Sequence, residues 1–454
     1  MTLGDHSTFL FPEIGRNYPT LVRGKGNYVY DSSGKRYLDA AGGGVAVINI
    51  GHGVDEVLEA MAEQANKLAY FSVAHFANEP QLELADMLMR MAPDDRGAVY
   101  FLSTGSEAIE YCVKIGRLFH LANGHVSKTK IISRWQGYHG STLLGLSLSG
   151  RIPRRRTFSP MLIDSVHIEP SFCYRCPFGR SYGSCDIDCA ADLEKAIRRV
   201  GAENVCAFIA EPIVGATAGA VVPPPEYFRI VREICDRHDI LLIVDEVMTG
   251  CGRTGRNFAI QHWGVTPDLI AVGKGISGGY APLSACVMRS SVVDVLRTKH
   301  KAGLIGPTHG GNPVSCAAGL AVLKYLETHR LVERCATMGE LMLGRLQQFA
   351  DECPWVGNVR GKGLLVGIEL VSDRKSRTPF ETKHGFARRV GEKALDAGLS
   401  VYPGTGTADG VAGEHILLAP PFTITDDEIE FIVRTLRDAI QSVASELNLS
   451  ATTL

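Results

Sequence analysis

The sequence predicts an α/β fold built on a mostly parallel sheet with helices on both faces. Short β-rich runs alternate with helical patterns through the middle of the chain. Several of these runs, such as residues 241–244 (LLIV), are apolar without alternation, which is typical of strands buried on both faces of a parallel sheet. Because both faces of such a sheet need cover, helices are expected on each of them.

The expected elements follow one another in order along the chain. Central strands are expected at residues 98–102, 130–133, 206–210, 241–245 and 269–272, and helices at residues 106–121, 190–200 and 225–238. Near the N-terminus, residues 20–40 read as a hairpin. Beyond residue 330 we expect a helix, a strand at 363–370, another helix, a strand at 416–418, and a last helix that opens at Thr425 with Glu428 three residues on, a capping box.

This order predicts one large domain and one small domain. The large domain spans residues 55–330 and contains the parallel sheet. The small α+β domain is assembled from both ends of the chain, residues 1–54 and 331–454.

Composition narrows the class of protein. The chain has 454 residues, a formal net charge of −2, and one short cluster of like charge, Arg154-Arg155-Arg156. We interpret that cluster as a solvated or phosphate-facing loop, not a nucleic-acid patch. The first residues lack the pattern of a signal peptide, and no run reaches the ~18 apolar residues of a membrane helix. We therefore expect a cytoplasmic protein with no membrane or nucleic-acid partner.

Four of the twelve cysteines are clustered in a loop rich in Gly, Pro and Ser: Cys173, Cys176, Cys185 and Cys189. Their spacing permits zinc coordination. A thiol-rich surface loop and a disulfide are the alternatives, although a reducing cytosol disfavours the disulfide. We expect no metal, and a non-catalytic metal-binding protein built around this loop stays open as a competing hypothesis.

The strongest chemical signal is the pair Lys274 and Asp245. Each ends or follows an apolar strand, and open α/β sheets bind ligands at the carboxyl ends of their strands. A lysine there can form an imine, and an aspartate can keep a pyridine nitrogen protonated, which are the two needs of a pyridoxal cofactor. An ordinary salt bridge is the competing interpretation of the pair.

Two further segments fit the same cofactor. Residues 103–107 (STGSE) lie between a strand and a helix, where backbone N–H groups can bind phosphate. Tyr138 and His139 follow another strand, and an aromatic ring there can cover a flat cofactor. Nucleotide motifs do not fit, because the glycines around Lys274 lack the pattern of a P-loop, and those around Lys362 precede a strand.

Five motifs, in one order, make the chain similar to class III aminotransferases. They are STGSEA at 103–108, AEPIVG at 210–215, DEVMTGCGRTG at 245–255, AVGKGISGGYAPLSA at 271–285, and THGGNPVSCAAGLAVL from Thr308. They span nearly the whole chain. The resemblance implies a pyridoxal-phosphate-dependent transferase of fold type I that forms a homodimer with shared active sites.

The resemblance also implies roles for the residues around the cofactor ring. Lys274 is then the lysine that holds pyridoxal 5'-phosphate and moves the proton during transamination, and Asp245 pairs with the pyridine nitrogen. Val247 packs against one face of the ring, and Tyr138 stacks on the other.

The remaining matched positions surround the phosphate and the rim of the ring. Gly105 and Ser106 are implied to bind the phosphate, joined by Thr308 from the neighbouring subunit. Glu211 matches the family's Glu-Pro site near the cofactor, and His139 is a weaker candidate for the lining of the site.

Several positions depart from ornithine-type members of the family. Ser141 replaces an arginine that grips a carboxylate, and Ala216 and Leu417 replace a paired glutamate and arginine. The glutamate and the arginine are expected to be lost together, because a buried charge left without its partner would lower the stability of the protein by ~3–5 kcal/mol. Met248 stands where many members have glutamine. The pocket is therefore expected to be more apolar than an ornithine pocket, and similar to that of ω-amine:pyruvate transaminases.

The expected function is transfer of an amino group from an amine or ω-amino acid to a 2-oxo acid such as pyruvate. Within the same fold, an aminomutase and a decarboxylating transaminase are the competing hypotheses. Which amine is the donor, and which residue holds the acceptor's carboxylate, are not predicted.

Overall fold

The computed structural model describes residues 18–300, 303–304 and 306–449. Its centre is a seven-stranded sheet, here called the large sheet, with the order β4-β10-β9-β8-β7-β5-β6. Strand β10 is antiparallel to both of its neighbours, and the other six strands are parallel to one another. The bounds are β4 (Ala98–Leu102), β5 (Lys130–Arg134), β6 (Val166–Ile168), β7 (Val205–Ala210), β8 (Leu241–Glu246), β9 (Leu269–Val272) and β10 (Ser284–Met288).

The predicted mostly parallel sheet is confirmed, and its burial explains the unbroken apolar runs. Leu242 and Val244 of β8 belong to one hydrophobic cluster, whereas Leu241 and Ile243 belong to another. Successive side chains of a strand point to opposite faces, so both faces of β8 are covered. The five predicted central strands are present within one residue at each end, and β6 and β10 were not predicted.

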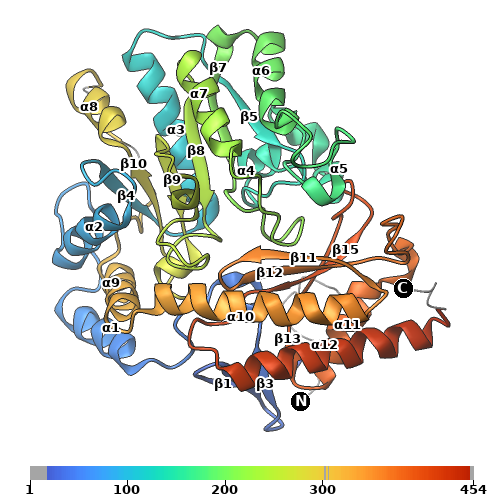
Figure 1. Cartoon of the computed structure of the whole chain (residues 1–454). Helices are drawn as coiled ribbons and strands as arrows, with labels where there is room; N and C mark the ends of the chain where they lie inside the picture. The colour runs from blue at the N-terminus through green and yellow to red at the C-terminus, as the bar shows by residue number, and fades with distance from the viewer. Residues whose placement is uncertain (1–17, 301–302, 305, 450–454) are drawn as a thin grey trace.

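Helices pack on both faces of the large sheet (Figure 1). Helix α3 contacts β7, β9 and β10, whereas α7 contacts β8 and α6 contacts β6. The helices of this part of the chain are α1 (Asp55–Lys67), α2 (Glu79–Met91), α3 (Gly105–Ala122), α4 (Leu143–Leu148), α5 (Ile152–Arg156), α6 (Asp188–Val200), α7 (Tyr227–Arg237), α8 (Ser290–Thr298) and α9 (Pro313–Thr328).

Two four-stranded sheets lie beside the large sheet and are built from the two ends of the chain (Figure 1). The first contains β1 (Leu21–Lys25), β2 (Tyr28–Asp31), β3 (Arg36–Asp39) and β13 (Leu399–Ser400), and the second contains β11 (Val356–Lys362), β12 (Leu365–Leu370), β15 (Glu414–Leu418) and β14 (Tyr402–Thr405). Strand β13 pairs with β3 in parallel, and this pairing ties the C-terminal part of the chain to the N-terminal part. The predicted domain boundaries at residues 54 and 330 stay a prediction.

Three helices accompany these terminal sheets: α10 (Leu331–Glu352), α11 (Phe386–Asp396) and α12 (Asp426–Glu446). The predicted capping box is confirmed at the start of α12, where the Glu428 amide donates to Thr425 Oγ1 at 3.3 Å and the Thr425 amide donates to the Glu428 carboxylate at 2.9 Å. The single strand expected at 363–370 is wrong in its extent. Gly363, with φ +55°, turns the chain between β11 and β12.

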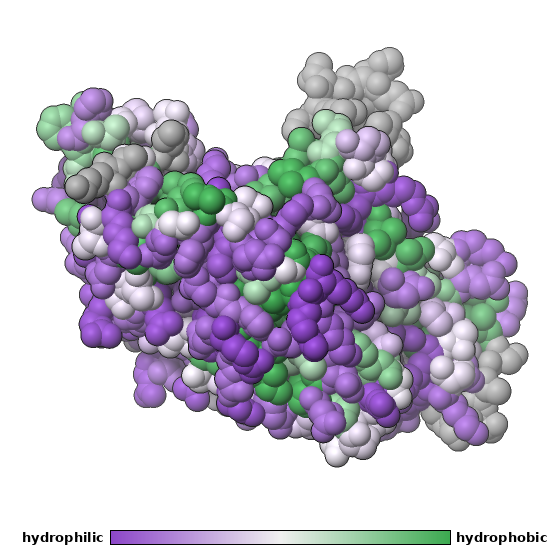
Figure 2. Space-filling view, turned by 90° about the horizontal axis from the view of Figure 1, so that it is seen from above, coloured by the Kyte–Doolittle hydropathy of each residue, from purple (hydrophilic) through white to green (hydrophobic). Residues whose placement is uncertain are grey.

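Across the described residues, no helix is both long and apolar enough to span a bilayer. Hydrophobic side chains nevertheless reach the surface in several places, seen as green patches among polar residues in Figure 2. Exposed large apolar side chains are concentrated between α1 and α2, where Tyr70, Phe71 and Phe76 are 40%, 45% and 65% exposed.

Candidate active site

One cavity, of about 340 Å³, collects eight of the nine residues predicted to form the site. They come from the carboxyl ends of strands that lie side by side in the large sheet, or from the segments that follow them. This is the edge at which open α/β sheets bind ligands. The eight residues are Gly105, Ser106, Tyr138, His139, Glu211, Asp245, Val247 and Lys274.

Lys274 follows β9 and is buried in this cavity. Burial lowers the pKa of its ammonium group to about 8, although the nearby carboxylates of Asp245 and Glu211 act in the opposite direction. Its backbone is left-handed, with φ +47°, a conformation that is uncommon outside glycine and concentrates at functional sites. Near neutral pH, a much larger fraction of this amine is therefore neutral than in an ordinary lysine.

Asp245, in β8, is 5% exposed and has a partner for each carboxylate oxygen. The Val247 amide donates to Oδ1 at 3.0 Å, and His139 Nδ1 lies 2.8 Å from Oδ2. Since a carboxylate accepts and does not donate, His139 supplies the proton of that hydrogen bond. His139 was a weaker candidate in the sequence, and the structure places it in direct contact with Asp245.

The start of helix α3 provides free backbone donors. The Thr104 hydroxyl and the Glu107 carboxylate form a capping box that satisfies the amides of Ser103, Thr104 and Glu107. In the part of the chain that the structure describes, the amides of Gly105 and Ser106 have no acceptor. Unpaired N–H groups at a helix N-terminus form an anion-binding position, which fits a phosphate.

Glycines bring the walls of the cavity close together. A Cβ atom on Gly105 would lie 2.7 Å from Val247 Cγ1, and one on Gly140 would lie 2.6 Å from Ser106 Oγ. Val247 thus packs directly against the start of α3. A side chain at either glycine would displace this wall.

Glu211 links two loops of the site. Its carboxylate accepts from the Tyr138 amide at 2.9 Å and from the Gly215 amide at 3.0 Å. Burial raises the pKa of Glu211, and the neighbouring Asp245 raises it further. The side chain therefore orients Tyr138, whose ring lies in the lining of the cavity.

Thr308 is the one predicted residue that does not line the Lys274 cavity of its own chain. Its carbonyl oxygen accepts from the Tyr70 hydroxyl at 3.0 Å, next to the exposed segment between α1 and α2. Its contribution to the phosphate site of a neighbouring subunit stays a prediction.

Two arginines that the sequence left unassigned line the same cavity. Arg154 lies with its guanidinium 5.3 Å from the centre of the Tyr138 ring, and Arg151 donates to Thr405 Oγ1 at 3.0 Å. Neither guanidinium forms an ion pair with any residue that the structure describes. Both therefore have donors available for an anion inside the cavity.

Arg154-Arg155-Arg156, which we interpreted as a solvated or phosphate-facing loop, belongs to a short helix and not to a loop. The three residues end the short helix α5, and each does something different. Arg155 is partly buried and donates to the carbonyl oxygens of Leu146 at 2.9 Å and Ser149 at 2.7 Å. Arg156 is exposed and lies outside the Lys274 cavity.

An apolar wall occupies the positions where ornithine-type members carry a charge pair. Ala216 and Met248 line the cavity, and both pack with Leu417, which is 1% exposed. Ser141 instead lies at the surface, where its amide donates to Ser106 Oγ at 3.1 Å. The wall offers no charged group to a substrate.

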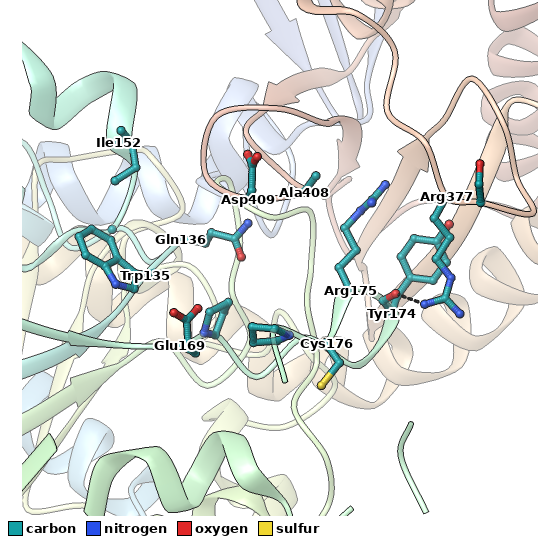
Figure 3. A pocket seen from close by; sticks show the side chains of 14 residues that line it. Trp135, Gln136, Ile152, Glu169, Tyr174, Arg175, Cys176, Arg377, Ala408 and Asp409 are labelled. Atoms are coloured by element: carbon teal, nitrogen blue, oxygen red, sulfur yellow. Dashed lines mark hydrogen bonds between the residues drawn. The ribbon is translucent and has the colours of Figure 1, made fainter. Parts of the chain in front are cut away.

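A second cavity, of about 630 Å³, contains none of the predicted site residues (Figure 3). Gly150 and Ile152 line it, whereas Arg151 between them lines the Lys274 cavity, so this segment separates the two. Figure 3 shows Ile152 on one side of the cavity and Arg377 on the other, where Arg377 donates to the Tyr174 carbonyl at 2.5 Å.

The clustered cysteines line one small pocket near this second cavity, and none of them forms a disulfide. No three of their sulfur atoms lie within 4.8 Å of one another, so the thiols are not arranged as a tetrahedral set. That the loop works without metal stays a prediction. The four residues are Cys173, Cys176, Cys185 and Cys189.

A buried lysine, a carboxylate and a helix N-terminus lie together at the strand ends of a mostly parallel sheet. This arrangement is typical of α/β enzymes that act on small molecules. Comparison with known proteins gives the family. The profile of the family described as Aminotransferase class-III matches residues 14–440. The chain belongs to the class III aminotransferases, and it is a transaminase. A non-catalytic metal-binding protein is therefore the wrong interpretation.

Relatives and solved structures agree with this assignment. The chain is 37% identical to the uncharacterized aminotransferase YodT of Bacillus subtilis, over 97% of this chain and 99% of that protein. It is 34% identical to a putrescine–pyruvate aminotransferase of Pseudomonas aeruginosa, over 94% and 91%. An amine transaminase of an uncultivated Pseudomonas species, solved in its PLP-bound form, superposes with a TM-score of 0.90 at 35% identity, over 96% and 99%.

Proposed function

We propose that this transaminase moves an amino group from an amine or an ω-amino acid to a 2-oxo acid such as pyruvate, with pyridoxal 5'-phosphate as its cofactor. One observation carries the proposal. The cavity that holds the buried Lys274 amine beside Asp245 is also lined by two arginines without carboxylate partners, Arg151 and Arg154. It thus combines cofactor chemistry with a place for a substrate carboxylate.

The residues of the cavity fit this cofactor. When bound, pyridoxal phosphate draws electrons from the carbon atom that carries the amino group. Lys274 would hold it covalently and, once displaced by substrate, carry a proton between two carbon positions. Asp245 would keep the pyridine nitrogen protonated, and the free amides of Gly105 and Ser106 would bind the phosphate.

The remaining cavity residues hold the ring in place. Val247 would pack on one face and Tyr138 on the other. Glu211 keeps the Tyr138 backbone fixed through the 2.9 Å hydrogen bond to its amide. His139 keeps the Asp245 carboxylate oriented through its hydrogen bond to Oδ2.

Arg151 and Arg154 are our candidates for the residues that hold the carboxylate of the 2-oxo acid. A guanidinium matches a carboxylate with two parallel hydrogen bonds. Arg151 is partly buried, and burial lowers the pKa of its guanidinium, with the nearby Arg154 acting in the same direction. An incoming carboxylate would relieve both the burial cost and the repulsion between the two cations.

The apolar wall sets the choice of donor. A donor carboxylate that points toward Ala216, Met248 and Leu417, away from Arg151 and Arg154, would find no charge there to pair with it. We therefore expect ω-amines to exceed ornithine by at least ~10-fold in kcat/KM, about 1.4 kcal/mol. The name of the Pseudomonas aeruginosa relative gives a diamine as donor and pyruvate as acceptor, which is the same kind of pairing.

A donor series with pyruvate tests the function. Putrescine, β-alanine and ornithine are compared by the rate of alanine formation, with carbon dioxide measured in parallel. Amine-dependent alanine without carbon dioxide supports transamination. Carbon dioxide released with each turnover would indicate a decarboxylating transaminase, and isomerisation of the donor without pyruvate would indicate an aminomutase. A higher kcat/KM for ornithine than for the diamine would overturn the pocket assignment.

Single substitutions test the arginines. Arg154→Ala and Arg151→Ala should each raise the KM for pyruvate by at least ~10-fold, because a charge-assisted pair is lost. The half-reaction with a diamine, which carries no carboxylate, should keep its rate in both variants. Arg156→Ala is the matched control, since Arg156 lies on the same helix but outside the cavity. Unchanged pyruvate KM in both cavity variants would reject the assignment.

A further inference from the structure

Three side chains of metal-binding type meet at the edge of the large sheet opposite the Lys274 cavity. His120 lies near the end of α3, His125 in the loop that follows, and Asp239 between α7 and β8, at the top of the view in Figure 1. Their ligand atoms all lie within 4.8 Å of one another. Asp239 Oδ2 is 3.0 Å from His125 Nδ1 and 4.0 Å from His120 Nδ1.

The surroundings of His120 determine which of its nitrogens carries a hydrogen. Nε2 lies 2.9 Å from the carbonyl oxygen of Cys206, and because a carbonyl only accepts, Nε2 must be the donor. The ring is completely buried, and a neutral imidazole that donates through Nε2 has no hydrogen on Nδ1. Nδ1 therefore carries a lone pair and no hydrogen.

This lone pair faces a second acceptor. Nδ1 of His120 is buried without a hydrogen-bond partner among the described residues, and it lies 4.0 Å from the Asp239 carboxylate. A buried acceptor left unpaired loses its hydrogen bonds to water, and native proteins rarely leave one. Two acceptors that face one another are both satisfied when a cation lies between them.

We propose that His120, His125 and Asp239 form a binding site for a divalent transition-metal ion, with Zn²⁺ as the best match. Two imidazoles and one carboxylate are a common ligand set for zinc, which leaves a fourth position for water. His125 and Asp239 have side chains that are 47% and 55% exposed, so the ion reaches the site from solvent. The bound ion ties the end of α3 to the turn before β8.

Outer contacts already hold the ligands in this arrangement. Metal-binding histidines usually donate the N–H that does not face the metal to a nearby acceptor, which fixes the ring. The Cys206 carbonyl accepts from His120 in this way. The His125 amide donates to the His120 carbonyl at 2.8 Å, and Arg117 donates to the Lys128 carbonyl at 3.0 Å, which fixes the loop between the two histidines and β5. Little rearrangement is then needed for binding.

Lys128 is a cation that lies close to these three side chains. Its ammonium donates to the carbonyl oxygens of Ala202, Val205, His238 and Asp239 at 2.7–3.2 Å, so the backbone holds it beside the trio, not between its members. The negative charge of Asp239 offsets part of the repulsion between the Lys128 ammonium and a bound cation. We expect an affinity for Zn²⁺ in the micromolar range.

Calorimetric titration of the cofactor-saturated enzyme with Zn²⁺, after removal of adventitious metal, tests the site. We expect one ion per chain. Binding should weaken at least 10-fold in His125→Ala and in Asp239→Asn. Both residues are exposed, and asparagine tolerates the left-handed φ of +52° at position 239. Zn²⁺ should also raise the melting temperature of the wild type and not that of these variants.

Two variants serve as controls. His75→Ala removes an exposed histidine elsewhere, and Cys176→Ser breaks the cysteine loop. Both should bind Zn²⁺ as the wild type does, and transamination should be unchanged in the His125 and Asp239 variants. Three outcomes would overturn the proposal. The first is the absence of saturable Zn²⁺ binding, which would assign the space to a bridging water, and the second is binding in both ligand variants equal to that of the wild type. The third is loss of binding in Cys176→Ser, which would place the metal at the cysteines.

Discussion

The imidazole of His139 donates to the carboxylate of Asp245, with 2.8 Å between Nδ1 and Oδ2, and both side chains are almost completely buried. The pair joins the segment after β5 to strand β8. The hydrogen bond fixes the orientation of the carboxylate that would lie opposite a protonated pyridine nitrogen.

Asp245→Asn should keep the cofactor bound and lower turnover by ~10² or more, about 3 kcal/mol. The neutral amide cannot stabilise a protonated pyridine nitrogen, so electron withdrawal by the ring is weakened. Single-turnover rates and the visible spectrum of the bound cofactor check this. His139→Asn removes the hydrogen-bond partner of Asp245 and leaves the carboxylate, so it should lower turnover less than Asp245→Asn does. Full activity of Asp245→Asn would contradict the proposed role.

Lys274→Ala should remove the covalent cofactor and at least ~10³ of the rate, because one amine both holds the cofactor and moves the proton. Purified wild-type protein should be yellow, and the variant should lose the absorption band of the lysine-bound cofactor. Mass spectrometry after borohydride reduction should place the label on Lys274 alone. Turnover near that of the wild type in the variant would mean that the lysine is wrongly assigned.

Reconstitution of the apoenzyme with pyridoxal phosphate should depend on pH through the amine of Lys274, whose pKa burial lowers to about 8. Only the neutral amine attacks the aldehyde, and its fraction falls about tenfold for each pH unit below that pKa. The rate should therefore rise from pH 6 to 8 and level off above it. Stopped-flow absorbance gives the profile, and a rate that still climbs beyond pH 10 would argue for an ordinary lysine.

Gly105→Ala should weaken cofactor binding by at least ~10-fold, because the added Cβ would lie 2.7 Å from Val247 Cγ1 at the start of α3. Equilibrium dialysis against pyridoxal phosphate measures the effect. Gly344→Ala is the control. Gly344 lies within α10, and a Cβ there meets nothing within 4 Å, so cofactor affinity should not change. Equal affinity in both variants would refute the phosphate position.

The homodimer with shared sites is tested with mixed dimers. Subunits that carry Lys274→Ala are combined with subunits that carry Thr308→Ala. If Thr308 completes the phosphate site of its neighbour, each mixed dimer regains one site with the cofactor affinity of the wild type. If each chain uses its own Thr308, no such site appears. Light scattering should also show that the cofactor-saturated enzyme is a dimer.

The residues that carry chemistry could be recognised from sequence because their signals are local. Asp245 lies at the end of a buried apolar strand, and Lys274 follows another with a single glycine between, whereas Glu211 was identified by the family resemblance. The carboxyl ends of parallel strands meet at one edge. Knowing the strands was therefore enough to bring these side chains together, and the structure confirms that they line one cavity.

The arginines of the cavity could not be recognised in this way. Arg151 precedes the short helix α5 and Arg154 lies on it, and nothing nearby in sequence distinguishes these two arginines from Arg155 or Arg156. What separates them is distant in sequence, since Arg151 reaches Thr405 and Arg154 faces Tyr138. Strand β10 was missed for a similar reason, because its pairing with β4 and β9 is set by partners far along the chain.

The sequence by itself therefore determined the class of fold, the residues expected to bind the cofactor and the absence of the ornithine-type charge pair, since each depends on a short pattern, on a family motif or on single positions. Only the tertiary structure decided which cations line the pocket, that His139 pairs with Asp245, and that His120 meets Asp239 from 119 positions away. Contacts of that kind depend on how strands and helices pack, and packing is decided by the whole core and not by any one segment.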